Sequence, residues 1–291
     1  MDVGRERPSA ADGVSTTLTW PGGPVVARTT LTGGASARGS AMSSGAVRIV
    51  ARSLHRTNAA ASVARVDAGP APVTVQAPLL SRAGVQVVFA WLADAGSLTC
   101  SLRALAARAR VSLATAQRVT QQARREGYLV GSSRETALAR GGKLLDLWVV
   151  AYRARLWDRQ RLGRFLAPDR DWWRGAGPAL REAGCQLGGD AAAIVLGAPL
   201  VSNSSLVYAD ALPAGLIAGQ RWRHDPASGN VEIRQRIWRP GGIVGPGHGG
   251  LDVVPSVLVY ADLLAGGDPR QAEIAQWLRR HDARLVDLDR T

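Results

Sequence analysis

The stretch SLRALAARARVSLATAQRVTQQARREGYLV, residues 101–130, has the clearest structural pattern in the chain. Its apolar residues recur at helical spacing over 102–108, and a short turn follows them. Ser112 comes next, and serine favours the N-cap of a helix because its side-chain oxygen accepts a hydrogen bond from a free backbone N–H. The pattern predicts two short helices joined by a tight turn, the second running from Ser112 to Glu126.

The residues on either side extend this pair into a larger unit. Apolar residues from Val85 to Leu92 share one face of a predicted helix that stops at Gly96. Beyond Gly127 the chain leads into a short strand, and SSRETALARGG, residues 132–142, suits the tip and return strand of a wing. We therefore expect a winged helix-turn-helix at residues 81–142.

Positive charge is concentrated in this part of the chain. Residues 81–165 contain 15 basic and 5 acidic side chains, whereas residues 166–291 contain 13 and 14, and the whole chain has a net charge of +13. Because neutralised phosphates release condensed counterions, a concentrated basic surface favours a polyanion such as double-stranded DNA. An arginine-rich solvated surface is the alternative, since Lys143 is the only lysine and the arginine content can reflect compositional bias.

The helix from Ser112 has one small apolar face and one polar face. Ala116, Val119 and Ala123 are expected to be buried, which leaves the polar face free. Arginine matches guanine in the major groove, glutamine matches adenine, and amides at a helix start favour a phosphate. The alternative is a plain amphipathic hairpin of a helical bundle. The predicted DNA-binding residues are Ser112, Thr115, Gln117, Arg118, Gln121, Gln122, Arg124 and Arg125.

The rest of the chain mixes helical and strand patterns. Residues 143–167 are predicted to form a connecting helix, and residues 168–291 a mixed α/β domain with a nearly neutral surface. The fold class is thus α+β, a winged helix-turn-helix followed by a mixed α/β C-terminal domain. The C-terminal elements expected are a helix at 188–197, a strand at 204–212, a hairpin of 221–226 with 230–238, a buried strand at 254–264 and a helix at 271–281.

Residues 1–80 form a low-complexity segment rich in Ala, Gly, Ser, Thr and Pro. Such a segment buries too little apolar surface to offset the entropy of ordering, so we expect a largely disordered tail, with a strand at 47–50 or 73–75 at most. The start lacks the apolar core of a signal peptide, and no apolar stretch approaches the ~20 residues that span a bilayer. We expect a cytoplasmic protein with no membrane partner.

Several motifs beyond the helix pair occur in a recognisable order. They are LLDLWVVAYRARL, GRFLAP, GGDAAA, GNVEI and VVPSVLVYADLLAGGDPRQAEIA. Over residues 80–282 this order resembles AbiEi-type antitoxins, the transcriptional regulators of type IV toxin–antitoxin systems. The resemblance implies a winged domain that binds the promoter and represses the operon. It also implies antitoxin activity against a nucleotidyltransferase-type toxin, often without a stable complex.

The resemblance also marks particular residues. DNA contacts would fall on residues 112–125, and the C-terminal domain would be marked by further polar residues. For three of these the residues themselves favour a structural role, with Asp268 capping a helix on which Arg270 and Glu273 form a pair. The C-terminal residues marked are Asp190, Tyr260, Asp262, Asp268, Arg270 and Glu273.

Catalytic motifs are incomplete. A nuclease needs an acidic residue two positions before a lysine, and Gly141 stands there relative to Lys143. GPGHGG at 245–250 follows no predicted strand and opens no helix, so it is not expected to bind a dinucleotide. We predict no enzyme, no cofactor and no metal, with a homodimer possible. The alternatives are a degenerate metal-dependent nuclease or nucleotidyltransferase-like enzyme using Asp262, Asp268 and Glu273, and a protein-interaction module.

Overall fold

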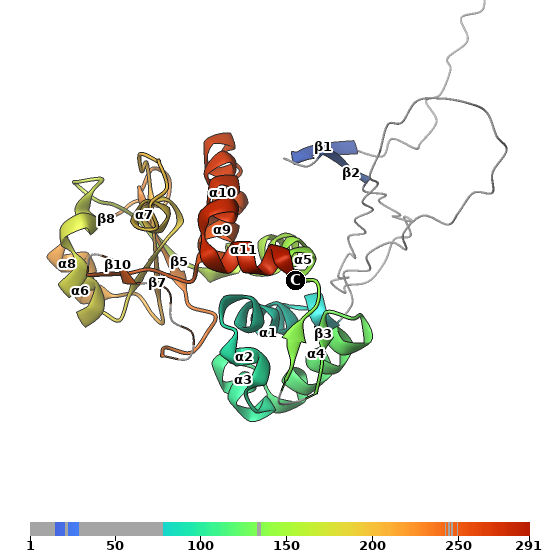
Figure 1. The fold of residues 1–291 in the computed structure, drawn as a ribbon. Coiled ribbons are helices and arrows are strands. Elements are labelled where there is room, and N and C mark those ends of the chain that lie inside the picture. The colour runs from blue at the N-terminus through green and yellow to red at the C-terminus, as the bar shows by residue number, and fades with distance from the viewer. Residues whose placement is uncertain are drawn as a thin grey trace, which may run out of the picture. The chain divides into compact units, whose positions relative to one another are not determined.

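A computed structural model describes residues 15–20, 23–28 and 78–291, the last range without 133, 134, 242, 244, 246 and 249. The chain divides into two compact units, residues 1–76 and residues 77–291 (Figure 1). In the first unit, β1 (Ser15–Trp20) pairs antiparallel with β2 (Gly23–Arg28), a hairpin that the composition did not predict. The strands expected at 47–50 and 73–75, and most of the predicted disordered tail, lie outside the described residues.

The second unit begins with short helices and a small hairpin. Serine side chains cap three of the helices, because Ser81, Ser101 and Ser112 each accept the N–H three residues further on. The elements are η1 (Pro78–Leu80), α1 (Arg82–Ala93), α2 (Gly96–Thr99), α3 (Leu102–Arg108), α4 (Leu113–Arg125), β3 (Leu129–Val130) and β4 (Ala137–Leu138). The helices expected from the sequence are present. Ser112 is the N-cap of α4 as predicted, and Gly127, the predicted stop, follows the C-cap Glu126 with a positive φ of 69°.

The predicted connecting helix is shorter than expected. α5 (Gly141–Arg155) is followed by η2 (Trp157–Gln160) and then by a strand, β5 (Arg161–Leu166), so the prediction of a helix over residues 143–167 was wrong at its C-terminal end. Gly163 disfavours a helix, and the backbone of β5 pairs with strands on both sides. Pairing with distant strands therefore determines the conformation of residues 161–166.

A five-stranded sheet organises the C-terminal part, in the order β6-β7-β9-β5-β8. Only β7 and β9 run parallel within it. The remaining strands are β6 (Gln186–Gly188), β7 (Ser205–Ala209), β8 (Arg223–His224) and β9 (Val231–Gln235). The expected pairing of 221–226 with 230–238 was wrong, because β5 lies between β8 and β9 and Phe165 is opposite a residue of each. The residues of the turn between β8 and β9 carry no local pattern that predicts the insertion of the distant strand β5 between them.

Short helices and a second small hairpin accompany the sheet. They are η3 (Trp172–Gly175), α6 (Gly177–Glu182), α7 (Gly189–Val195), α8 (Ala214–Gly219), β10 (Gly247–His248) and β11 (Leu251–Asp252). α7 and β7 match the helix and the strand that the sequence predicted. From the motif GPGHGG, Gly247 and His248 form β10, which pairs antiparallel with β11.

Three helices close the chain: α9 (Ser256–Ala265), α10 (Pro269–His281) and α11 (Ala283–Arg290). The strand expected at 254–264 was wrong, since this segment is α9. All ten residues of α9 are buried, and a segment buried on every side has no periodic pattern that separates helix from strand. α10 matches its prediction and α11 was not predicted.

The core joins the first helices to the C-terminal part. Trp148 on α5 stacks on Phe89 of α1 with ring centroids 5.6 Å apart, and its indole N–H donates to the Val85 carbonyl at 2.8 Å. Arg284 on α11 donates to the carbonyls of Trp91 and Leu92, each at 2.7 Å, and so caps the end of α1. Residues 78–291 therefore form one packed body wherever they are described. None of the described helices has the length and apolar character needed to cross a membrane.

Candidate nucleic-acid interface and an interior polar pocket

The helix α4 presents a polar face to solvent. Ala116, Val119 and Ala123 are at most 1% exposed and pack it onto the unit. Of the predicted contact residues, Ser112 is exposed at the N-cap, and four more are exposed along the other side of the helix: Gln117, Arg118, Gln121 and Arg125. The structure thus brings these four side chains together on one accessible helical face, as major-groove reading requires.

The start of α4 is held by its cap. The hydroxyl of Ser112 accepts the Thr115 N–H at 3.2 Å, and the two side-chain oxygens lie 2.9 Å apart. Arg118 donates to the Thr115 hydroxyl at 3.4 Å, which turns its guanidinium toward this end of the helix. Cationic and backbone donors therefore gather at one point, a combination that suits a phosphate.

Two of the predicted residues also make internal contacts. Arg124 donates to the Gly131 carbonyl at 2.6 Å and to the Thr136 hydroxyl at 2.8 Å, so it attaches the β3–β4 hairpin to α4. Gln122 donates to the Glu126 carboxylate one turn further along. Sequence spacing placed both on the free face and gave no sign of these partners.

A long-range ion pair fixes the turn between α3 and α4. Arg110 has a positive φ of 51°, which is unfavourable for a residue with a side chain. Its guanidinium pairs with Asp210 at 2.6 Å and donates to the Arg236 carbonyl at 3.2 Å. The turn before α4 is therefore anchored to the sheet, a contact that no local pattern indicated.

In the C-terminal part, the Asp262 carboxylate is fully enclosed. It accepts hydrogen bonds from Tyr208 at 2.7 Å, from Tyr152 at 3.1 Å and from the Gly189 N–H at 3.3 Å. Burial raises the pKa of Asp262 to about 7, although these hydrogen bonds favour the charged form. The site links α5, β7, α7 and α9.

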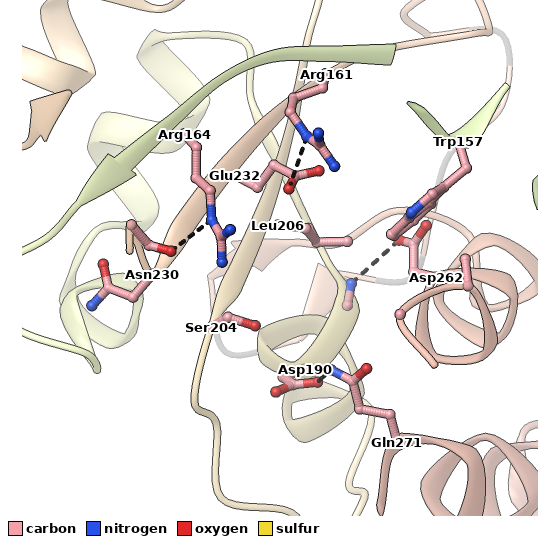
Figure 2. A pocket seen from close by; sticks show the side chains of 14 residues that line it. Trp157, Arg161, Arg164, Asp190, Ser204, Leu206, Asn230, Glu232, Asp262 and Gln271 are labelled. Atoms are coloured by element: carbon pink, nitrogen blue, oxygen red, sulfur yellow. Dashed lines mark hydrogen bonds and ion pairs between the residues drawn. The ribbon is translucent and has the colours of Figure 1, made fainter. Parts of the chain in front are cut away.

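Asp190 lies on the same side of a polar pocket of about 300 Å³. It accepts from the Gln271 amide at 2.7 Å and, weakly, from the Asn203 N–H at 3.5 Å, and burial raises its pKa. Figure 2 shows Asp190 and Asp262 on one side of this pocket and the arginines of β5 on the other. The remaining polar lining includes Trp157, Arg161, Arg164, Ser204, Asn230 and Glu232.

The other marked C-terminal residues do not join this pocket. Asp268 accepts from the Arg270 N–H at 2.9 Å and caps α10, as the sequence predicted. The Tyr260 hydroxyl accepts instead from Arg279 at 3.0 Å. Glu273 is exposed, and among the described ion pairs there is none between it and Arg270. Asp190 and Asp262 are therefore the two marked residues that the fold brings together.

The carboxylates that the enzyme alternative would use are those of Asp262, Asp268 and Glu273. Among the described residues, no three His, Cys, Asp or Glu side chains gather where they could hold a metal ion. In particular Asp262 is buried between tyrosines, whereas Asp268 and Glu273 are exposed. The carboxylates of the enzyme alternative thus do not form a joint site.

Comparison with known proteins identifies the family. The family model described as "Transcriptional regulator, AbiEi antitoxin, Type IV TA system" matches residues 137–285, from β4 into α11. The match defines a regulator of a toxin–antitoxin system and covers just over half of the chain. The chain belongs to the AbiEi antitoxin family, which confirms the resemblance found in its motifs. No curated protein and no solved structure matched.

Proposed function

We propose that this protein is a sequence-specific DNA-binding repressor whose α1–α4 and β3–β4 form a winged helix-turn-helix. The observation that carries the proposal is the exposed polar face of α4, with Gln117, Arg118, Gln121 and Arg125 opposite a buried alanine and valine stripe. α4 would enter the major groove, and the β3–β4 hairpin, which Arg124 attaches to it, would act as the wing. The charge excess of residues 81–165 supports the same surface.

The family gives this binding a biological setting. An AbiEi-type regulator would bind the promoter of its own operon and repress it, and would oppose a nucleotidyltransferase-type toxin. We propose that the chain acts without catalysis, as a regulator with residues 81–142 for DNA and residues 168–291 for antitoxicity. Expression of the chain is then expected to restore the growth of cells arrested by a toxin encoded beside it.

The test is operator binding by a double variant. Arg118→Ala with Gln121→Ala removes two base-reading side chains that make no contact with the buried core. Each good bidentate pair contributes about 1–3 kcal/mol of base discrimination, so preference for the operator over a shuffled duplex should fall at least tenfold. Fluorescence anisotropy on a duplex from upstream of the protein's own gene measures this preference.

The matched control is Arg280→Gln, which removes an exposed charge from α10, far along the chain from α4. The control is expected to keep the operator preference. Operator binding by the double variant at the wild-type level, with an unchanged melting temperature in all three proteins, would refute the assignment of α4 as the recognition helix.

A further inference from the structure

A second cavity, of about 760 Å³, opens beside the polar pocket along β5 and β8. Four arginines line it and no carboxylate does: Arg164, Arg170, Arg221 and Arg223. They come from β5, the segment after it, the end of α8 and β8. We call this cavity the arginine groove. Because the C-terminal part of the chain is nearly neutral, four cations without an acid at one place are a local feature and not a general excess.

These arginines lack acidic partners among the described residues. Arg164 donates to the backbone carbonyls of Gly229 at 2.8 Å and Ala227 at 3.4 Å, which positions its guanidinium without neutralising it. Neighbouring arginines behave differently, since Arg161 and Arg234 both pair with Glu232. The charges of the groove are thus left for an anion from outside.

The backbone conformation of Arg221 supports the view that the groove's guanidinium groups are available to an outside anion. It ends α8 in the left-handed region, with φ of 54°, and the Arg221 and Trp222 N–H groups bond back to α8. Glycine is the usual residue at such a helix end. At Arg110, the other described non-glycine residue with positive φ, the side chain gains an ion pair with Asp210. Arg221 gains none within the described residues and is exposed, so its guanidinium is available to an anion from outside.

The arginine groove is continuous with the polar pocket. Arg164, Ser204, Gly229 and Asn230 line both cavities. The polar pocket adds the carboxylates of Asp190, Glu232 and Asp262 to the arginines of β5 (Figure 2). Within the described part of the chain, one Asp190 carboxylate oxygen has a single donor, the Asn203 N–H at 3.5 Å, and can accept another hydrogen bond. The volumes, about 760 Å³ and 300 Å³, are within the range of small-ligand sites.

We propose that this paired cavity binds a nucleotide, with its phosphates in the arginine groove and its base in the polar pocket. Planar guanidinium groups bind phosphate oxygens in pairs of hydrogen bonds. The ring and amino N–H groups of a base are donors that match the Asp190 carboxylate. The ligand is either a free nucleoside phosphate or the terminal nucleotide of a single strand, and its site is separate from α4.

Binding is tested by titration calorimetry on the full chain. The probes are ATP, GTP, CTP and UTP, inorganic pyrophosphate, and a single-stranded RNA pentanucleotide. We expect saturable binding of at least one triphosphate, at least tenfold tighter than pyrophosphate because the base contributes contacts. Tighter binding of the pentanucleotide would identify the strand end as the source, and tighter binding of a triphosphate the free nucleotide. Pyrophosphate binding equal to that of every nucleotide, or no binding at all, would overturn the proposal.

Variants locate the site. Arg221→Gly removes a guanidinium and relieves the positive φ, so it should keep or raise the melting temperature while weakening nucleotide binding roughly tenfold. Arg223→Gln should weaken it similarly, whereas Arg280→Gln, outside both cavities, should not. Asp190→Asn should change the ranking of the four bases and leave pyrophosphate binding unchanged. Equal losses in Arg221→Gly and Arg280→Gln would show a nonspecific charge effect and reject the site.

Discussion

Arg110 and Asp210 form an ion pair of 2.6 Å between residues that are 100 positions apart in the chain. The arginine belongs to the turn before α4, and the aspartate follows β7 of the central sheet. Asp210 also lies 3.4 Å from Arg236, whose side chain is only 4% exposed. One carboxylate thus links the proposed recognition helix to the family-matched part of the chain.

Replacing the Asp210 carboxylate should lower both the stability of the protein and its affinity for the operator. Asp210→Ala leaves the buried Arg236 guanidinium without its acid, so we expect a loss of about 1–2 kcal/mol in the free energy of unfolding, measured by urea denaturation. The turn before α4 also loses its anchor, and operator affinity should fall beyond what the lost stability explains. An Asp210→Ala protein with wild-type stability would show that the ion pairs of Asp210 do not contribute to the free energy of unfolding.

The two adjacent arginines at the end of α4 should behave differently. Arg125 is exposed, so Arg125→Gln should leave the melting temperature unchanged and reduce the slope of log K against log salt by about one unit, as expected for one lost phosphate contact. Arg124 holds Gly131 and Thr136, so Arg124→Gln should also cost about 1 kcal/mol of stability. Identical effects of the two substitutions on stability would contradict the internal role of Arg124.

Asp262 should make stability depend on pH. Its pKa is raised to about 7 in the folded protein, against about 3.9 in an unfolded chain. Between these values the folded state binds a proton that the unfolded state does not, so the contribution of Asp262 is fully present below pH 4 and is lost as the pH rises through 7. The stability difference between wild type and Asp262→Asn should therefore shift against the wild type from pH 5 to pH 8, as measured by urea denaturation. A difference that is independent of pH would show an ordinary carboxylate pKa.

The sequence predicts the parts of this molecule that depend on local chemistry. The caps at Ser112 and Asp268 and the bounds of α3 and α4 follow from side chains near in sequence. The secondary-structure predictions were wrong where contacts between segments distant in sequence determine the conformation. Strand β5 forms because β8 and β9 pair with it, and α9 is a helix whose complete burial removes any periodic pattern.

The candidate sites follow the same rule. The exposed face of α4 could be derived from helical spacing, because all its members lie within four turns. The arginine groove could not, since Arg164 and Arg223 become neighbours only when β5 pairs with β8. The single local signal there was a positive φ at Arg221, which a sequence does not display.

Variants of the N-cap of α4 allow effects on stability to be distinguished from effects on operator binding. Ser112→Ala and Asp268→Ala each remove the N-cap of a 13-residue helix, α4 in one case and α10 in the other. Each should lower the free energy of unfolding by about 1 kcal/mol, because one first-turn N–H loses its acceptor. Only Ser112→Ala should weaken operator binding, since it disturbs the helix start where Thr115 and Arg118 gather. Anisotropy titrations at a temperature where both variants are fully folded make the comparison. Equal operator affinity of the two variants would place the DNA contacts elsewhere than the start of α4.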